Sequence, residues 1–319
     1  MMEPGLVTPL AILAGALLLD HFLGEYPAPL HPVVWMGKLV SLLLRCAPRN
    51  GWWRPFVFGV FLAFGVTTVS AAAAFMALRA AALVPGLDIV VGALLLKASF
   101  ALRELGAAAE RVRAPVAEGD LPRARAALRS LCSRDPAALD EEELLAATIQ
   151  SLAENASDSF VAPLLYFLLF GIPGAIAYRA INTLDAMVGY RGPFEALGKA
   201  SARLDDLANW LPARLTALLF LLAGWLTGRN LARSWRVFRR DCAQTPSPNG
   251  GRPMATMAGL LGVQLEKKGV YTLGDREKPI VATTVLQAWR VVVVSAWFMA
   301  GLCALGILAL HYVRSLSWC

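Results

Sequence analysis

Long uninterrupted apolar runs are the feature that most constrains this chain. Two of them, FVFGVFLAFGVTTVSAAAAF at 56–75 and VVVVSAWFMAGLCALGILAL at 291–310, are each about 20 residues long, which is enough to cross a bilayer as a helix. The whole chain is 57% hydrophobic and 17% charged, whereas soluble domains average about 45–50% and about 25%. These values argue against an ordinary cytosolic enzyme, a disordered protein and a secreted disulfide scaffold. We therefore predict an all-α, polytopic integral membrane protein.

The apolar runs also predict where the helices lie. Residues 87–102 form the shortest run and contain Lys97, and Pro85-Gly86 before them predicts a tight turn. No stretch alternates in the manner of a strand, so we expect one membrane-embedded helical domain over residues 1–319. The six runs are 6–24, 56–84, 87–102, 159–181, 211–228 and 290–313.

Basic residues are concentrated in a few segments between the runs. Segment 103–158 carries seven arginines and segment 229–289 carries ten lysines or arginines, whereas loop 183–210 has only Arg191, Lys199 and Arg203. Lys and Arg collect on the cytoplasmic side of membrane proteins. We therefore expect a helical cytoplasmic insert at about 103–158 and a basic cytoplasmic segment at about 229–289. No nucleic-acid-binding motif accompanies the net charge of +7, so no nucleic-acid partner is expected.

The fourth apolar run decides between two topologies. If all six runs cross the membrane, loop 183–210 lies outside, and a straight run 159–181 would hold the polar motifs at its two ends about 35 Å apart. That run contains the breaker cluster GIPG at 171–174, however, and a break there would return the chain to the same side. Segment 211–228 would then also fail to cross. We favour this topology with broken, re-entrant helices, and six full spans remain the alternative.

Polar residues flank the fourth run. Glu154 and Asp158 share a face if the helix continues, and with Asn155 they lie in the motif AENASDSF. Asn182 and Asp185 follow the run in INTLDAMVGYR. Carboxylates at a membrane edge act as bases or metal ligands, and polar groups there usually have a role. The alternative for the first motif is a solvated helix end with a capping residue.

The motif SARLDDLANW at 201–210 is the strongest candidate for a metal site. Asp205, Asp206 and Asn209 offer three oxygen ligands, and Mg²⁺ is often held by a few carboxylates together with phosphate oxygens. Lys199 and Arg203 lie close enough in the sequence to bind a phosphate. The alternative is an amphipathic surface helix with internal Arg–Asp pairs.

A polar loop, TPSPNGG at 245–251, follows the arginine-rich segment RNLARSWRVFRRD. Ser247 and Asn249 offer hydrogen bonds to a ligand, and the two glycines permit close backbone approach. The basic segment is typical of a contact with anionic lipid, and attraction of a nucleotide is the alternative. A phosphate-binding P-loop is excluded because GPFEALGKA at 192–200 has the wrong spacing. The five widely spaced cysteines indicate neither a disulfide framework nor a zinc site.

Taken together, these motifs resemble one family. The strings LLLDHFLGEYPAPLHPVVWMGKLV, AENASDSFVAPLLYFLLFGIPGAIAYRAINTLDAMVGYR, SARLDDLANWLPARLTAL and SPNGGRPMATMAGLLGV occur in this order. They are similar to motifs of the membrane-bound CobD/CbiB family of cobalamin biosynthesis, whose members are adenosylcobinamide-phosphate synthases. The resemblance covers about residues 10–315.

The resemblance implies an ATP- and Mg²⁺-dependent amide ligation in the cell (inner) membrane, with the site on the cytoplasmic side. Adenosylcobyric acid, the corrinoid substrate, would be joined to (R)-1-aminopropan-2-ol or its O-phosphate. On this basis Asp205, Asp206 and Asn209 would hold metal and phosphate, and Arg203 would bind phosphate. Glu154, Asp158 or Asp185 would serve as base or second metal ligand, and Asn155, Asn182, Lys199, Ser247 and Asn249 would bind substrate or nucleotide. Other enzymes of the pathway are possible partners.

Two other classes of function stay open at this point. A transporter would explain a broken helix with polar groups near the membrane midplane, and it predicts uptake without an ATP-dependent product. A non-catalytic scaffold for corrinoid-pathway enzymes would explain the basic segments, and it predicts that Asp205→Asn leaves function intact.

Overall fold

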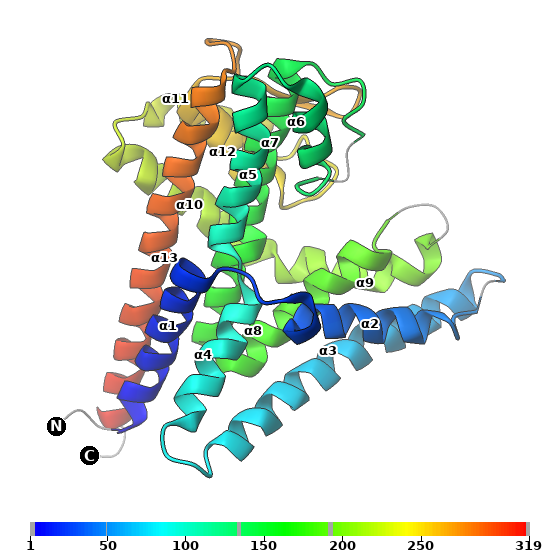
Figure 1. The fold of residues 1–319 in the computed structure, drawn as a ribbon, viewed down its shortest axis with the longest axis vertical. Coiled ribbons are helices and arrows are strands. Elements are labelled where there is room, and N and C mark those ends of the chain that lie inside the picture. The colour runs from blue at the N-terminus through cyan, green and yellow to red at the C-terminus, as the bar shows by residue number, and fades with distance from the viewer. Residues whose placement is uncertain (1–3, 49, 133–134, 191–193, 317–319) are drawn as a thin grey trace. The chain divides into compact units, whose positions relative to one another are not determined.

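The computed structural model of the protein describes residues 4–48, 50–132, 135–190 and 194–316. Arg49 and Arg191, two of the charges used for the topology, lie outside these residues. The described chain is helical except for two three-residue strands (Figure 1), which confirms the all-α prediction. It divides into two compact units, and each unit is assembled from separate stretches of sequence. The first unit comprises Met1–Ala101, Ala162–Ala208 and Ala300–Cys319, and the second comprises Leu102–Val161 and Asn209–Met299.

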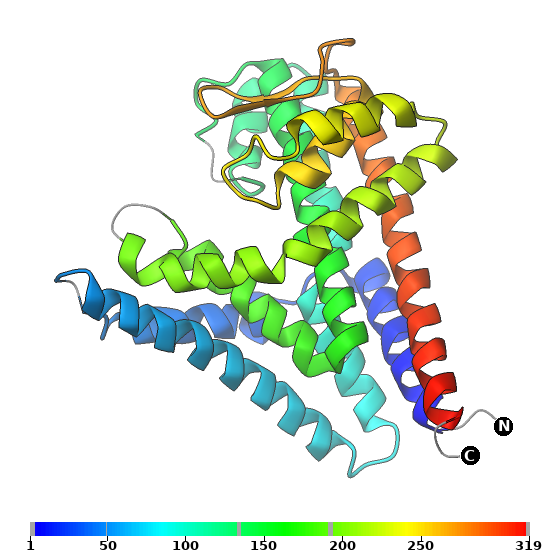
Figure 2. The ribbon, with the colours of Figure 1, turned by 180° about the vertical axis from the view of Figure 1, so that it is seen from behind.

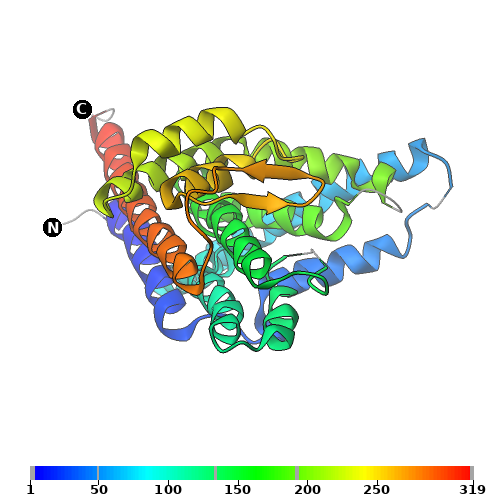
Figure 3. The ribbon, with the colours of Figure 1, turned by 90° about the horizontal axis from the view of Figure 1, so that it is seen from above.

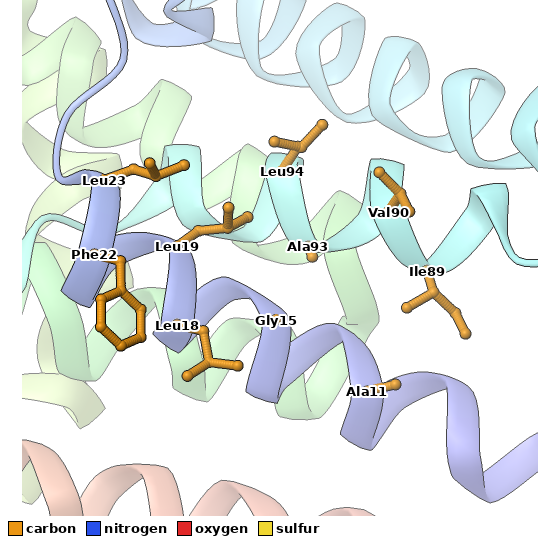
Figure 4. Close-up of a pocket in the computed structure, with 10 residues that line it drawn as sticks. All are labelled: Ala11, Gly15, Leu18, Leu19, Phe22, Leu23, Ile89, Val90, Ala93 and Leu94. Atoms are coloured by element: carbon orange, nitrogen blue, oxygen red, sulfur yellow. The ribbon is translucent and has the colours of Figure 1, made fainter.

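The first unit contains most of the apolar helices. In it α1 packs against α4, and α3 packs against both α8 and α9. Apolar side chains of α1 and α4, including Leu19, Phe22 and Leu94, line an open groove of about 510 Å³ (Figure 4). The elements of this unit are α1 (Pro4–Leu23), a 3-10 turn (Ala28–Leu30), α2 (Pro32–Leu44), α3 (Trp53–Ala81), α4 (Leu87–Ser99), α8 (Ala162–Val188), α9 (Glu195–Ala208) and the end of α13 (Ala282–Leu316).

Helix α8 is broken where the sequence predicts it. Gly171 has φ 67° and ψ −162°, a conformation outside the helical region that glycine adopts readily. Tyr166 and Tyr178, on either side of the break, stack with ring centroids 5.1 Å apart. In a straight helix, residues twelve apart are separated by about 18 Å along the axis. The two halves therefore fold back on one another, and Figure 2 shows the chain changing direction there.

The second unit surrounds one large apolar core. Helices α5, α6 and α7 pack together, and α10 and α11 pack on α12. Helix α7 begins with a capping box between Asp140 and Glu143. The elements are α5 (Leu102–Ala117), α6 (Leu121–Leu128), α7 (Glu141–Ala156), a π-helical turn (Ser157–Val161), α10 (Trp210–Leu226), α11 (Leu231–Asp241), α12 (Gly251–Leu261), β1 (Leu265–Lys267), β2 (Tyr271–Leu273) and the start of α13.

Three described helical stretches are long and apolar enough to cross a membrane, or four if the bent pair α9 and α10 counts as one. They are Trp53–Ala81, Glu141–Val188 and Ala282–Val313. All six apolar runs contain a helix, but the run at 87–102 yields only the 13 residues of α4. A helix of that length rises about 20 Å, less than the hydrocarbon core of about 30 Å. The protein is therefore a membrane protein with several spans, but not every apolar run forms one.

Two sequence expectations are wrong in detail. Residues 25–55 lie between the first two predicted apolar runs, yet they contain α2, which begins at Pro32 with His31 as its N-cap. No strands were expected, yet β1 and β2 form an antiparallel hairpin that pairs Leu265 with Leu273 (Figure 3). Strands of three residues are too short to produce a clear alternation of apolar and polar positions. The tight turn at Pro85-Gly86 is confirmed, because Gly86 has φ 80° immediately before α4.

Candidate functional site

In the first unit, the candidate site residues lie on the end of α8 and on α9. Close packing holds these two helices together, because a Cβ on Gly198 would overlap the carbonyl oxygen of Val188 at the end of α8. On the other side of α9, a Cβ on Gly59 of α3 would overlap the carbonyl oxygen of Leu197. Glycine at 198 and 59 therefore allows α9 to pack between α3 and α8, with its acidic residues in a fixed position.

Asp185 and Asp206 form the carboxylate pair of this unit. Asp185 lies on α8 and Asp206 on α9, close enough for the negative charge of Asp206 to act on Asp185. Asp205 does not share the orientation of Asp206, since adjacent residues on a helix point about 100° apart. Its charge acts instead on Tyr166. The structure thus groups Asp206 with Asp185, whereas the sequence had grouped it with Asp205 and Asn209.

The cationic and amide residues of this unit have identifiable contacts. Arg203 is 74% exposed and lies 3.6 Å from the carboxylate of Asp206. The ammonium of Lys199 lies over the ring of Trp52, 5.7 Å from its centroid. Asn182 accepts a hydrogen bond of 3.3 Å from Arg179. Arg203 is therefore close to the acidic residues, whereas Lys199 makes a cation–π contact with an aromatic ring.

In the second unit, Glu154 lies beside the SPNGG loop. A Cβ on Gly250 would come within 2.6 Å of Oε1 of Glu154, so the carboxylate lies directly against the backbone of the loop. Among the described residues, none donates a hydrogen bond to the Glu154 carboxylate or forms an ion pair with it. One turn earlier, Gln150 donates to the carbonyl of Glu266 and accepts from the hydroxyl of Tyr271, both at 3.0 Å. One face of α7 thus joins the loop to the β-hairpin.

The next candidates lie where α7 ends. Asn155 donates a hydrogen bond of 3.0 Å to the carbonyl of Ser151, one turn earlier. Asp158 lies in the π-helical turn Ser157–Val161. A π-turn is wider than an α-turn and often occurs at functional sites, and it places Asp158 differently from an uninterrupted α-helix. The sequence carried no signal for this turn.

The predicted binding residues of the loop take part in hydrogen bonds and packing within the loop itself. The hydroxyl of Ser247 accepts hydrogen bonds from the N–H groups of Asn249 and Gly250, at 3.2 and 3.4 Å, directly before α12. Asn249 is buried, with 5% of its surface exposed. Asn209 is also buried and is the N-cap residue of α10. The predicted binding residues thus lie in a closely packed loop and at a helix start.

A buried ion cluster in the first unit was not among the sequence candidates. Lys97 has no exposed surface, and its ammonium lies 2.7 Å from Glu25 and 3.2 Å from Asp20. Glu25 also accepts a hydrogen bond of 2.7 Å from Nε2 of His31, whose Nδ1 accepts from the N–H of Val33 at 3.2 Å. Since Nδ1 is an acceptor, the proton of the neutral ring lies on Nε2. The charged Lys97 within an apolar run was the available signal.

Electrostatics in this cluster favour ionised Glu25. Burial opposes ionisation of this carboxyl, but hydrogen bonds from His31 and Lys97, with the attraction of the Lys97 charge, outweigh it and lower the pKa to about 2. Burial, together with the charges of Glu25 and Asp20, raises the pKa of Tyr26 to about 12. The hydroxyl of Tyr26 therefore stays protonated and donates a hydrogen bond of 3.0 Å to the carbonyl of Leu94.

No group of three or more His, Cys, Asp or Glu side chains among the described residues is arranged to hold a metal ion. Mg²⁺ does not require one, since it usually takes one or two carboxylates and fills its remaining positions with water and phosphate oxygens. Asp185 and Asp206 supply two oxygen donors with unfavourable mutual repulsion, which a divalent cation would relieve. Two carboxylates are as many as Mg²⁺ usually takes from a protein.

Comparisons with known proteins agree with the motifs. The profile of the CobD/CbiB protein family matches residues 13–309. "Cobalamin biosynthesis protein CobD" of Dehalococcoides mccartyi is 42% identical over 274 residues, covering 85% of this chain and 88% of the relative. The protein of that name from Geobacter metallireducens is 43% identical over 293 residues, covering 88% and 90%. "Probable cobalamin biosynthesis protein CobD" of Methanothermobacter thermautotrophicus is 41% identical over 270 residues, covering 84% and 88%.

No solved structure is significantly similar to the chain. The match to the family profile, however, runs through both compact units and spans every candidate site residue described above. On this evidence the chain belongs to the CobD/CbiB family.

Proposed function

We propose that the protein acts in cobalamin biosynthesis as an amide-forming ligase, an adenosylcobinamide-phosphate synthase. It would join adenosylcobyric acid to (R)-1-aminopropan-2-ol or its O-phosphate at the expense of ATP. The observation that carries the proposal is the family match over residues 13–309, which includes both carboxylate-bearing groups. The membrane-spanning helices support a location in the cell membrane, and the basic segments support a site on the cytoplasmic side.

The reaction needs an activated carboxylate. In the proposed route a propionate oxygen of the corrinoid attacks the γ-phosphorus of ATP, which gives an acyl phosphate and ADP. The amine nitrogen then attacks the acyl carbon, the C–O bond to phosphate breaks, and phosphate leaves with that electron pair. The nitrogen loses a proton to a base. The products are the amide, ADP and phosphate.

The acidic residues of α8 and α9 are suited to the nucleotide. We assign Asp185 and Asp206 to binding Mg²⁺, with Asp205 and Asn209 as further candidate ligands. Bound Mg²⁺ would neutralise charge on the phosphate oxygens during transfer. Arg203, 3.6 Å from Asp206, is exposed enough to turn toward a phosphate. Lys199 is a weaker candidate because its ammonium already contacts Trp52.

Glu154 is the best candidate for the base. Its carboxylate has no described hydrogen-bond or ion-pair partner, and it lies against the backbone of Gly250. A base must have a free lone pair within hydrogen-bond reach of the proton that it takes. Asp158, on the π-turn that follows, is the alternative in the same unit.

The direct test is ligation by the purified protein. Adenosylcobyric acid, either amine and MgATP would be incubated with the protein, and the corrinoid product would be identified by its mass. We expect amide formation that requires ATP and Mg²⁺. Asp206→Asn should lower the rate at least about a hundredfold if a metal contact is lost, while the protein remains folded in the membrane. Wild-type rates in Asp206→Asn would disprove the metal assignment.

Transport is the second candidate function, because the fold-back of α8 at Gly171 resembles the broken helices of transporters. It would require uptake of a corrinoid into sealed vesicles that contain the protein, without ATP and without a mass change. Product formation in detergent, where no compartments exist, would favour the ligase.

A further inference from the structure

Some arginines of the second unit have a carboxylate partner, whereas others, among them Arg214, Arg229 and Arg252, have none among the described residues. Arg233 pairs with Glu277, Arg240 with Asp241 and Asp275, and Arg276 with Glu142. Arg214 on α10 and Arg252 on α12 make no ion pair with any described residue. Both are only partly exposed. A guanidinium removed from water without a counter-charge is unfavourable, so the pair requires an explanation.

The guanidinium group of Arg252 has few hydrogen-bond partners. Its Nε is buried without a hydrogen-bond partner among the described residues. Its contact with a side chain is a long one, 3.9 Å from a terminal nitrogen to Sγ of Cys242, and sulfur is a weak acceptor. The guanidinium therefore retains N–H donors for a ligand.

Arg214 is held beside it. Its guanidinium donates to the carbonyl of Trp210 at 2.5 Å and stacks over the Trp210 ring, 3.9 Å from the centroid. These contacts fix the side chain but leave its positive charge uncompensated. Helix α10 packs against α12, and the charge of Arg252 acts on Arg214. Two positive charges are thus kept near each other without an anion.

The surrounding backbone adds to the positive potential. Arg252 is the second residue of the 11-residue helix α12, whose N-terminus carries partial positive charge. The loop before it is fixed by close packing, because a Cβ on Gly251 would come within 2.6 Å of Oγ1 of Thr245. The partial positive charge at the start of α12 thus adds to the charges of the two arginines.

We propose that Arg214 and Arg252 form a binding site for the phosphate group of a small phosphorylated ligand. Arginine forks match phosphate oxygens in bidentate geometry, and one dianion would neutralise both charges. The ligand's identity, though not the site, rests on the proposed function: the phosphate belongs either to the nucleotide or to a phosphorylated amino alcohol. Arg203, the phosphate ligand predicted from the sequence, is by contrast 74% exposed and near a carboxylate.

The test uses Cys242 as a reporter, because its sulfur lies 3.9 Å from Arg252. The full-length protein in neutral detergent would be alkylated with iodoacetamide, and the rate at each cysteine would be read by peptide mass analysis. Inorganic phosphate, ATP with chelator, and aminopropanol phosphate would each be titrated against chloride at equal ionic strength. Exposed Cys46 in the first unit is the internal control. We expect at least one phosphate compound to slow alkylation of Cys242 but not of Cys46.

Substitutions test whether the two arginines cause the protection of Cys242. Arg252→Gln and Arg214→Gln should each raise the half-protecting concentration about ten- to hundredfold, the effect expected for a lost charged hydrogen bond. Arg252→Lys should raise this concentration less than Arg252→Gln does. Arg129→Gln, which removes an exposed charge at the C-cap of α6, should behave as wild type. Unchanged protection in Arg252→Gln, or no protection by any phosphate compound, would overturn the proposal. The assay needs no turnover, so protection without ligation would refute the ligase and keep the site.

Discussion

Lys97 shows how one residue can matter more than its sequence context indicates. In the sequence it weakens the prediction of a helix at 87–102, since a charge in an apolar run is costly. In the structure it holds Glu25, 72 positions away, and Asp20, so three elements of the first unit meet at one ammonium. The apolar pattern could not reveal these partners, because it describes which face is buried and not which residue lies opposite.

Replacing Lys97 should destabilise the protein strongly. Lys97→Met would leave the buried carboxylate of Asp20 and the partly buried carboxylate of Glu25 without their cation, and breaking a buried ion pair in this way costs about 3–5 kcal/mol. We expect a corresponding drop in the free energy of unfolding, measured by titration from a mild into a denaturing detergent. Lys38→Met, at an exposed position on α2, should change it by less than about 0.5 kcal/mol. Equal effects in the two variants would contradict a special role for the cluster.

The same cluster predicts a pH dependence of stability. The pKa of Glu25 falls from 4.5 to about 2 in the folded protein. A lowered carboxyl pKa stabilises the folded state above the unfolded pKa, and this stabilisation is lost as the pH falls through the folded value. The difference in stability between wild type and Glu25→Gln should therefore be constant above pH 4.5 and shrink between pH 4.5 and about 2. A difference that stays constant down to pH 2 would show that Glu25 is not ionised in the cluster.

The sequence indicated which kinds of residue form the candidate site, but not which of them lie together. Asp205 and Asp206 are adjacent in the sequence, yet the charge of Asp206 acts on Asp185 and the charge of Asp205 acts on Tyr166. The carboxylate of Glu154 lies against Gly250, 96 positions away in the sequence. Arg214 and Arg252 carried no signal, because an arginine becomes informative only when its missing counter-charge is visible.

Among the elements, the break in α8 was easier to predict from the sequence than the π-turn, the β-hairpin or α2. GIPG at 171–174 predicted the fold-back of α8, because glycine and proline act on the backbone locally. The π-turn Ser157–Val161, the β-hairpin and α2 were missed. The first two are shorter than any periodicity can detect, and the basic residues around α2 suggested a loop.

A substitution can test whether the close packing of α9 on α8 positions the acidic residues. In Gly198→Ala the new methyl would overlap the carbonyl of Val188, so α9 must shift away from α8. We expect the free energy of unfolding to fall by about 1–3 kcal/mol, as in other overpacked cores, and ligation to fall with it because Asp206 moves relative to Asp185. Gly65→Ala on α3, where nothing lies within 4 Å of the added Cβ, is the matched control. Normal activity in Gly198→Ala would show that α9 does not position the acidic pair.

For the whole molecule, the fold class followed from hydropathy, while the division into two compact units did not. The sequence predicted one domain with a helical insert at 103–158 and a basic segment at 229–289. Both segments fall in the second unit, which also takes α10 and the first part of α13. This division depends on contacts between distant segments, and hydropathy contains no information about those contacts.

Membrane topology can be tested by thiol labelling. In a cysteine-free background, we expect single cysteines at exposed Arg129, Lys268 and Tyr190 to resist an impermeant reagent in intact cells and to react after permeabilisation. The first two lie in basic segments that favour the cytoplasm, and Tyr190 follows the folded-back helix α8. Labelling of Tyr190→Cys in intact cells would instead support six full spans.

The order in which the ribosome makes the chain has a consequence for this architecture. The first unit begins at the N-terminus, but it also needs 162–208 and the last stretch from residue 300, and the second unit needs 209–299. Domains usually fold in turn during synthesis, the N-terminal one first. Here neither unit is complete until α13 emerges, so the helices made earlier must wait for partners that have not yet been synthesised. A nascent chain stopped before α13 would keep both cores open, and quality-control proteases would have their longest access to this protein while it is being translated.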